Sequence, residues 1–390
     1  MTLKSTICSL LLVTLMLQAV YPQQGQSLWL ESFERELSGE EGFHPDGKKK
    51  NTLNQILTIS KSGNSFNFMY LGPLVDALNN MYLASDDEKY LKYNHQILEN
   101  LITASTDSKI KKGAKSWYVS SNQEAYSGAN GNEWMLFEGH LFRYIVQYLY
   151  IVQDRFSKLE SEDIKSNFSK QVEFVVLNVW DKWITHSVAT HGDLTNFYGV
   201  RLHIGSHWAT IAIFLEDMVE DEAKQNELRR FYSSYNFHLR RNIGLTNDKL
   251  YWDSTWDTPF LAAHIDRRSR GYDKKRTQDV AHGNHVLQYI YSAVKLKKGW
   301  SKTDVNFFSQ VFLKNVINQE NLISRDVDGS GDYSYRNISD GWAKLAFYND
   351  DVKSKLYEYY KKNQSNVEQS YQNLQFFAVM CLLESKSQHH

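Results

Sequence analysis

Hydrophobic residues recur at intervals of three and four positions along most of the chain, which places them on one face of an α-helix. The windows with this pattern are 71–104, 133–157, 163–183, 201–241, 279–297, 303–317 and 351–384. Alternation of hydrophobic and polar positions, which would indicate β-strands, is scarce. The chain has only four prolines, so few positions break a helix. We therefore predict an all-α fold.

Several of these windows divide into two helices joined by a short polar turn, for example at 83–90 and 216–224. Successive pairs begin near residues 68, 133 and 201, at nearly regular intervals and without a detectable sequence repeat. Repeated helical hairpins of this kind can stack and bury a continuous core. We expect an α/α toroid, a barrel of about five to seven helical hairpins, that forms a single large domain.

The first residues have the pattern of an export signal. Lys4 precedes an apolar run from Ile7 to Leu17, which is shorter than the roughly 20 residues needed to cross a bilayer. We expect residues 1–23 to be a cleaved signal peptide and residues 24–390 to form the domain of a secreted or periplasmic protein. An uncleaved anchor is the alternative, and we expect no membrane span in the mature chain.

Composition narrows the possible partners. The chain is 42% hydrophobic and 14% aromatic, which is enough to bury a sizeable core. Its 44 basic and 45 acidic residues leave a formal net charge of -1, which provides no global attraction for nucleic acid or an anionic membrane. Cys8 lies in the expected signal, so Cys381 would be alone in the mature chain, without an intramolecular disulfide. Any polyanion must be bound by a local basic cluster.

The longer segments between the predicted hairpins carry tryptophan and tyrosine. These segments are 109–134, 189–199, 250–260 and 324–337. Aromatic rings on loops can stack on the flat faces of sugars, and we expect Trp252 and Trp256 to form such a platform. The alternative is that the loop aromatics close the ends of a helical barrel.

His203 and His207 are four residues apart and share one face of a predicted helix. A zinc pair can have this spacing, but a zinc site needs a third ligand, and the absence of a glutamate between the two histidines excludes the metalloprotease signature. A structural role is a second possibility. We favour a third, in which Arg201 and both histidines form a cationic, hydrogen-bonding wall of a cleft.

The stretch from His264 to Tyr272 supplies a candidate base. Arg267, Arg268 and Arg270 lie between these two residues. Nearby guanidinium groups favour a phenolate and lower the pKa of a tyrosine from its usual value near 10. Such a tyrosine could remove the C5 proton of a uronic acid in a β-elimination, in which the C4 glycosidic oxygen leaves. This reaction requires donors that neutralise the C6 carboxylate in the transition state.

Three motifs resemble the helical-toroid polysaccharide lyases: GSHWA at 205–209, DSTWDTPFLAAH at 253–264 and RGY at 270–272. These enzymes carry a charge neutraliser on one helix, and a histidine followed after a short spacing by a catalytic tyrosine. The resemblance implies that His207 is the neutraliser, although many members have asparagine there. It also implies that His264 is the histidine and that Tyr272 is both base and acid.

Two further segments, QDVAHGNHV at 278–286 and DGWAKLAFYND at 340–350, resemble parts of helical-barrel lyases that act on alginate or glucuronan.

The first of these segments offers a rival neutralising group. Asp279 could cap a helix whose first turns present His282 and His285, with the amide of Asn284 between them. The sequence leaves open whether His264 or His282 contacts the substrate. The predicted catalytic residues are thus Tyr272, His264, His207, His282 and Arg268. The predicted substrate-binding residues are Arg201, His203, Arg267, Arg270, Trp252, Trp256, Asn284 and His285.

A calcium site is a weaker expectation. Asp326, Asp328 and Ser330 follow the order of an EF-hand loop, but Asn337 stands where the bidentate glutamate should be, so a polar turn is favoured. We expect no other cofactor.

Two other function classes compete with the lyase. An inverting glycoside hydrolase would use two carboxylates roughly 6.5–9.5 Å apart, and Glu138 with Asp253 or Asp257 could supply them. A neutral glycan, however, needs no cluster of histidine and arginine. A non-catalytic glycan-binding protein would need the aromatic loops alone. We expect a monomeric lyase whose partner is an anionic polysaccharide.

Overall fold

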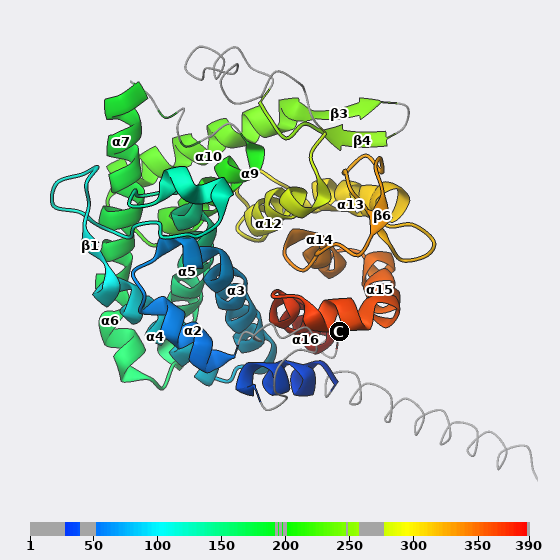
Figure 1. Ribbon diagram of the computed structural model, residues 1–390, viewed down its shortest axis with the longest axis horizontal. Coiled ribbons are helices and arrows are strands. Elements are labelled where there is room, and N and C mark those ends of the chain that lie inside the picture. Colours follow the sequence, from blue (N-terminus) through cyan, green and yellow to red (C-terminus); the bar gives the residue numbers. More distant parts are fainter. Residues whose placement is uncertain are drawn as a thin grey trace, which may run out of the picture.

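The computed structural model describes residues 28–39, 52–191, 194, 197, 201–246, 249–256 and 277–387 (Figure 1). The described chain is mostly helical, as predicted, and buries one continuous hydrophobic core. Three short two-stranded antiparallel ladders lie in the connections between helices. The expected signal at 1–23 lies outside the described residues.

The helices are a segment at 28–38, α2 (Leu53–Ser60), α3 (Phe68–Ser85), α4 (Lys89–Ala104), α5 (Met135–Arg155), α6 (Glu162–Val175), α7 (Asp181–His191), α9 (Leu202–Glu216), α10 (Glu222–Asn242), α12 (Val280–Lys295), α13 (Lys302–Val311), α14 (Gly341–Lys344), α15 (Asp350–Gln369) and α16 (Asn373–Ser387). Short 3-10 turns are η1 (Ser65–Asn67), η2 (Glu124–Ala129), η3 (Phe156–Lys158) and η7 (Leu345–Phe347), and π-helical turns are η4 (Val176–Trp180) and η6 (Phe312–Val316). The paired strands are β1 (Thr106–Asp107) with β2 (Lys115–Ser116), β3 (Ile243–Thr246) with β4 (Lys249–Trp252), and β5 (Ile323–Ser324) with β6 (Tyr333–Ser334).

Every predicted helical window coincides with one of these helices or with a consecutive pair. The predicted turns at 83–90 and 216–224 lie between α3 and α4 and between α9 and α10. Asp86 ends α3 in a left-handed conformation with φ of 55°, and the Asp221 side chain accepts a hydrogen bond from the Lys224 backbone at the start of α10. Such side-chain caps satisfy backbone N–H groups that have no partner within the helix.

Six helices pack against one another in series. Helix α16 contacts α3, α3 contacts α5, α5 contacts α9, α9 contacts α12, α12 contacts α14, and α14 contacts α16. A second set lies outside them: α4 packs on α3, α6 on α5, α10 on α9, α13 on α12 and α15 on α16. In Figure 1 the second set follows the periphery of the molecule. Helices α3, α5, α9, α12, α14 and α16 are called the inner helices below.

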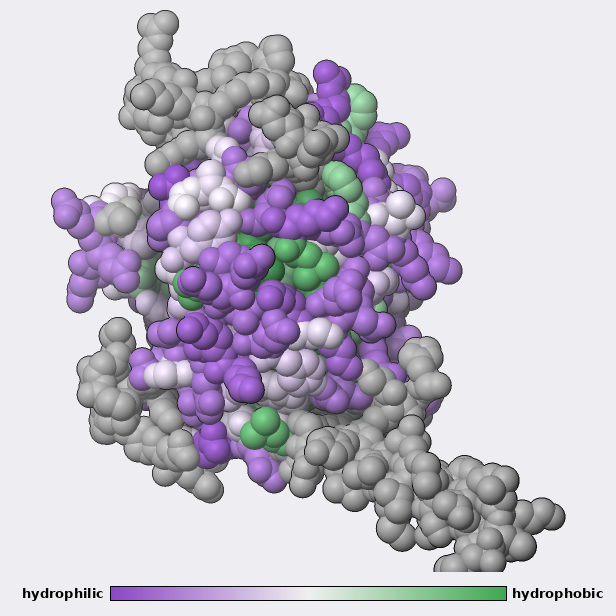
Figure 2. Space-filling model, turned by 90° about the vertical axis from the view of Figure 1, so that its right-hand side faces the viewer, coloured by the Kyte–Doolittle hydropathy of each residue, from purple (hydrophilic) through white to green (hydrophobic). Residues whose placement is uncertain are grey.

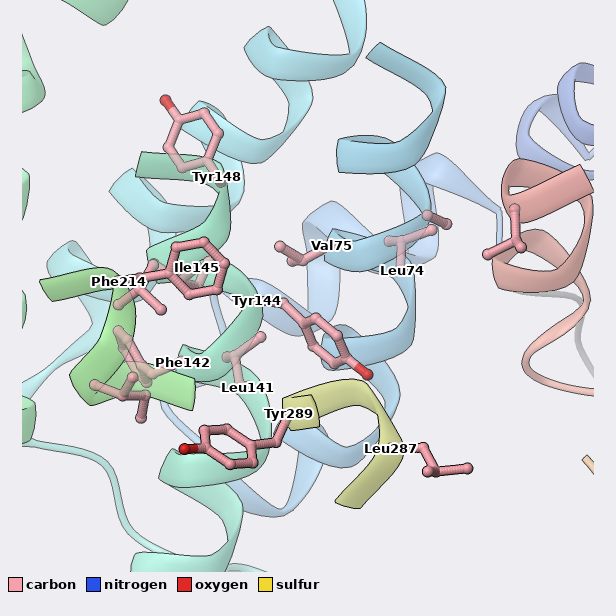
Figure 3. Packing of buried hydrophobic residues seen from close by; sticks show 14 of the residues in the cluster. Leu74, Val75, Leu141, Phe142, Tyr144, Ile145, Tyr148, Phe214, Leu287 and Tyr289 are labelled. Atoms are coloured by element: carbon pink, nitrogen blue, oxygen red, sulfur yellow. The ribbon is translucent and has the colours of Figure 1, made fainter. Parts of the chain in front are cut away.

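The core between the inner helices is built largely from aromatic and branched side chains. Figure 3 shows Phe142 and Ile145 of α5 beside Phe214 of α9, while Tyr144 of the same helix points between α3 and α12. Phe142, Tyr144 and Ile145 are fully buried. Helix α5 therefore packs against α3 on one side and α9 on the other.

The hydropathy of the surface is shown for one face of the molecule. Hydrophilic residues cover most of the described part of the face shown in Figure 2, and hydrophobic residues form a small group near its middle. None of the described helices is both long enough and apolar enough to cross a bilayer.

Candidate functional site

A cavity of about 210 Å³ lies where the inner helices begin. Its lining comes from the first turns of α3 (Met69), α5 (Leu136 and His140), α9 (His203 and His207) and α12 (Ala281, His282, Asn284 and His285), from Asn337 before α14, from Tyr371 and Gln372 before α16, and from Tyr126 in η2. Helix N-termini carry a partial positive charge and backbone N–H groups without intrahelical partners. The end of the inner-helix set that holds this pocket therefore favours an anionic ligand.

Three histidines meet in the pocket wall. The ring centroid of His140 lies 5.3 Å from that of His207 and 5.3 Å from that of His285, and the last two are 5.0 Å apart. One ring nitrogen from each of the three lies within 4.8 Å of the other two. The group His140, His207 and His285 is called the histidine triangle below.

Asp340 and Arg143 support one corner of the triangle. The Nδ1 atom of His285 lies 2.8 Å from Oδ2 of Asp340, and Arg143 Nη2 lies 3.1 Å from the same oxygen. Asp340 and Arg143 are both buried. Arg143 Nη2 also lies 3.0 Å from this Nδ1 atom, so Nδ1 donates to Asp340 in one tautomer of His285 and accepts from Arg143 in the other.

The triangle histidines are held in their neutral form. Burial lowers the pKa of His140, His207 and His285 well below the ordinary value, and the Arg143 guanidinium lowers each further. Burial and the neighbouring His282 act in the same way on the pKa of His203. The predicted cationic wall is therefore wrong for His203 and His207, because burial disfavours a charged imidazole.

His207 has no hydrogen-bond partner among the described residues. The side chain is fully buried, and neither ring nitrogen is hydrogen-bonded to another group. A buried polar group without a partner is costly and rare in proteins, so the position of His207 calls for a ligand.

The start of α12 confirms the predicted cap. The Asp279 side chain accepts from the backbone N–H of His282 at 3.0 Å, and the ring Nδ1 of His282 lies 2.8 Å from the same carboxylate. Burial tends to raise the pKa of Asp279, but these contacts with His282 outweigh it and hold the pKa well below its usual range. His282 thus lines the pocket with a half-exposed ring, and its centroid lies 4.3 Å from that of His203.

The structure brings together five of the predicted site residues. His203, His207, His282, Asn284 and His285 all line the one pocket. Outside the described residues lie His264, Arg267, Arg268, Arg270 and Tyr272, together with Asp257.

Arg201 precedes α9 but is not part of the pocket lining among the described residues. Its Nη1 donates to Ser254 Oγ at 3.2 Å, and its backbone forms a bridge with Thr255.

The predicted sugar platform is wrong for both tryptophans in this structure. Trp252 is fully buried, and its ring stacks on Trp342 at 6.1 Å between centroids. Trp256 is 5% exposed and packs edge-on against Tyr235. A ring that binds a sugar must present a face to solvent, whereas both of these rings are buried against other aromatic side chains of the core.

Glu138 is equally unsuited to be the acid of a glycoside hydrolase. The side chain is fully buried, where Oε1 accepts from Lys182 Nζ at 2.7 Å and from Ser116 Oγ at 3.1 Å. Its other oxygen accepts from the Trp183 indole at 2.9 Å. Burial raises the pKa of Glu138 even beside Lys182. No glycosidic oxygen can reach this carboxyl group, so its role is structural.

The expected calcium loop folds as a polar turn. Arg325 donates from Nε and Nη2 to Oδ2 of Asp326, at 3.0 and 2.8 Å. The Asp328 carboxylate accepts from the backbone N–H of Ser330 at 2.9 Å. The carboxylate of Asp326, at the first position of the expected calcium loop, is thus paired with the Arg325 guanidinium. The loop is therefore better suited to this ion pair than to a metal ion.

Reasoning from the sequence missed His140, Arg143 and Asp340 as members of this site. No spacing rule connects them, because they lie on α5 and before α14, far along the chain from the other histidines. One weak signal was present: Arg143 follows His140 by one turn of the same predicted helix.

Comparisons of the chain with protein-family models, with curated proteins and with solved structures found no match.

Proposed function

We propose that this protein is a polysaccharide lyase that cleaves a uronic-acid-containing polysaccharide, of the alginate or glucuronan type, by β-elimination. The observation that carries the proposal is the pocket where the inner helices begin, which gathers five histidines, two tyrosines and two asparagines. Helix N-termini and N–H donors suit a carboxylate, and a uronate is the sugar that brings one.

We infer that the inner helices form the inner ring of an α/α toroid. The support is the order of neighbours, in which α3, α5, α9, α12, α14 and α16 each contact the next and α16 contacts α3. The outer helices alternate with the inner ones along the chain, as repeated hairpins require. In such an arrangement the inner helices run in the same direction, which explains why their first turns share one pocket.

In this proposal, uncharged hydrogen-bond donors, the Asn284 amide and the His207 imidazole, stabilise the negative charge on the C6 carboxylate. Asn284 Oδ1 accepts from the backbone N–H groups of Gly341 and Trp342, at 2.7 and 3.0 Å, which leaves its NH₂ group for a ligand. His207 adds an imidazole N–H with no protein partner. Donors fixed before the reaction stabilise the charge that develops on the carboxylate when the C5 proton leaves.

The proton itself is assigned to Tyr272. This assignment rests on the sequence argument, since Tyr272 lies outside the described residues. The pocket offers two other phenols, Tyr126 and Tyr371, which are the competing candidates. The proposal also places the protein outside the cytoplasm, with residues 1–23 as its export signal, and expects a monomer.

The test is a direct assay with alginate, glucuronan and neutral glycans. A lyase leaves an unsaturated uronate at the new non-reducing end, so ultraviolet absorbance should rise with a uronan and stay flat with neutral glycans. New reducing ends without that absorbance would indicate a hydrolase. Binding without any cleavage would indicate a glycan-binding protein, and either result overturns the proposal.

A further inference from the structure

We propose that the histidine triangle, His140, His207 and His285, binds one divalent transition-metal ion of the zinc class. The ion would sit in the wall of the pocket, with one coordination position facing the cavity. The three ligands belong to α5, α9 and α12, and the inference holds whether or not the protein is a lyase. It also revises the sequence argument, which left the pair His203 and His207 without a third ligand.

The three rings have the separation that a metal site requires. One nitrogen from each ring lies within 4.8 Å of the other two. Tetrahedral zinc with Zn–N bonds of about 2.0–2.1 Å holds its nitrogens about 3.3 Å apart.

His207 is the strongest single argument. The side chain is fully buried, lines the pocket, and forms no hydrogen bond through either nitrogen to the part of the chain that the structure describes. A structural histidine in a core normally donates one N–H and accepts at the other nitrogen. His95 shows this contrast within the same protein, since its ring contacts Tyr148, Gln171 and Asp163. A metal ion would satisfy the unused nitrogen of His207.

His285 has the support that a metal ligand usually has. Its Nδ1 lies 2.8 Å from Asp340 Oδ2 and 3.0 Å from Arg143 Nη2, so Nε2 is the ring nitrogen that takes no part in these contacts. A carboxylate behind a ligating histidine fixes the tautomer and makes the ligand more basic. Arg143 lies nearby, but its Nη2 is 3.1 Å from Asp340 Oδ2, which compensates the positive charge.

The donor set selects the kind of metal. Three imidazoles suit zinc, cobalt, nickel or copper, whereas calcium and magnesium need several oxygen ligands. Three protein ligands with an open fourth position distinguish catalytic from structural zinc sites. The open position here faces the cavity that Tyr126 and Tyr371 also line. An ion at this place could therefore contact an anionic ligand in the pocket.

The test uses the full mature chain without a polyhistidine tag, stripped with a chelator and dialysed. Zinc is added, excess is removed by gel filtration, and bound metal is counted by mass spectrometry. We expect one zinc ion per chain in the wild type, and loss of that ion in His140→Ala and His207→Ala. The control His238→Ala removes a histidine of α10 that is not part of the pocket, and should keep the ion. All variants retain the C-terminal His389 and His390, so only the difference between them counts.

A spectroscopic measurement on the wild type tests the same site without any variant, so the test does not depend on whether the variants fold. Cobalt(II) bound by three imidazoles in a four-coordinate site gives intense visible absorption, which zinc should abolish by competition. The proposal is overturned if the stripped wild type gives no such bands, or if folded His207→Ala retains as much zinc as the wild type. Neither readout uses a sugar, so failure of the lyase assay leaves this result unaffected.

Discussion

Arg143 and His285 share a single carboxylate oxygen, Oδ2 of Asp340, at 3.1 and 2.8 Å. The arginine and the aspartate are each 1% exposed, so neither charge has water as an alternative partner. Helix α5 is thereby tied to the start of α14 and to α12 through one atom. The same carboxylate therefore orients His285 in the pocket wall and stabilises the packing of three helices.

Loss of the Asp340 carboxylate should therefore be costly. Asp340→Leu leaves the Arg143 guanidinium buried without a counter-charge, and breaking such a pair typically costs about 3–5 kcal/mol. Urea denaturation should show a fall of this size in the free energy of unfolding. The double variant Asp340→Leu with Arg143→Met should recover part of the loss, because no unpaired charge remains. Equal stability of the single variant and the wild type would contradict this account.

The pair Glu138 and Lys182 should behave in the same way, although it lies away from the pocket. Glu138→Leu leaves Lys182 with the Ser116 hydroxyl at 2.6 Å and the Glu133 carboxylate at 3.3 Å, and should lower the free energy of unfolding by about 3 kcal/mol. The activity per folded molecule should not change, because the carboxyl group is inaccessible. A variant that folds normally but loses all glycan cleavage would instead restore the hydrolase interpretation. Glu138→Leu combined with Lys182→Met is the matched control for stability.

The helices could be predicted because their periodicity and the turn residues between them are visible within a few neighbouring positions of the sequence. The same reasoning grouped His203 with His207, and His282 with His285, since residues three and four apart share a helical face. His140 could not be added in this way, because it approaches His207 only through the packing of α5 against α9.

The errors have the same origin. A tryptophan such as Trp252 has identical sequence properties whether it stacks on a sugar or on Trp342, and only the fold distinguishes the two. Glu138 resembled a catalytic acid until Lys182, on another helix, proved to be its partner. Protonation was misjudged because the burial of His203 and His207 depends on the whole inner-helix set.

The proposed base can be separated from its competitors with three conservative variants. Tyr272→Phe should reduce β-elimination by a factor of about 10²–10⁴, because the proton acceptor is removed and the ring is kept. Tyr126→Phe and Tyr371→Phe should retain most of the activity. Initial rates on a uronan, followed by ultraviolet absorbance, would rank the three. If Tyr371→Phe or Tyr126→Phe has the large effect instead, that tyrosine is the base and the assignment to Tyr272 is wrong.

Stability should fall as the pH drops below about 6.5, the usual pKa of histidine in an unfolded chain. Burial lowers the pKa of His140, His203, His207 and His285 in the folded protein, so the unfolded chain binds more protons in this range. Their contribution is fully present above pH 6.5 and is lost progressively as the pH falls through the folded-state values. Each unit of lowered pKa is worth about 1.4 kcal/mol.

Urea denaturation of metal-stripped protein at a series of pH values between 8 and 5 would measure how the free energy of unfolding changes with pH. His207→Leu should flatten that slope, since it removes one titrating group from the core. A slope unchanged in His207→Leu would show that another group controls the acid response.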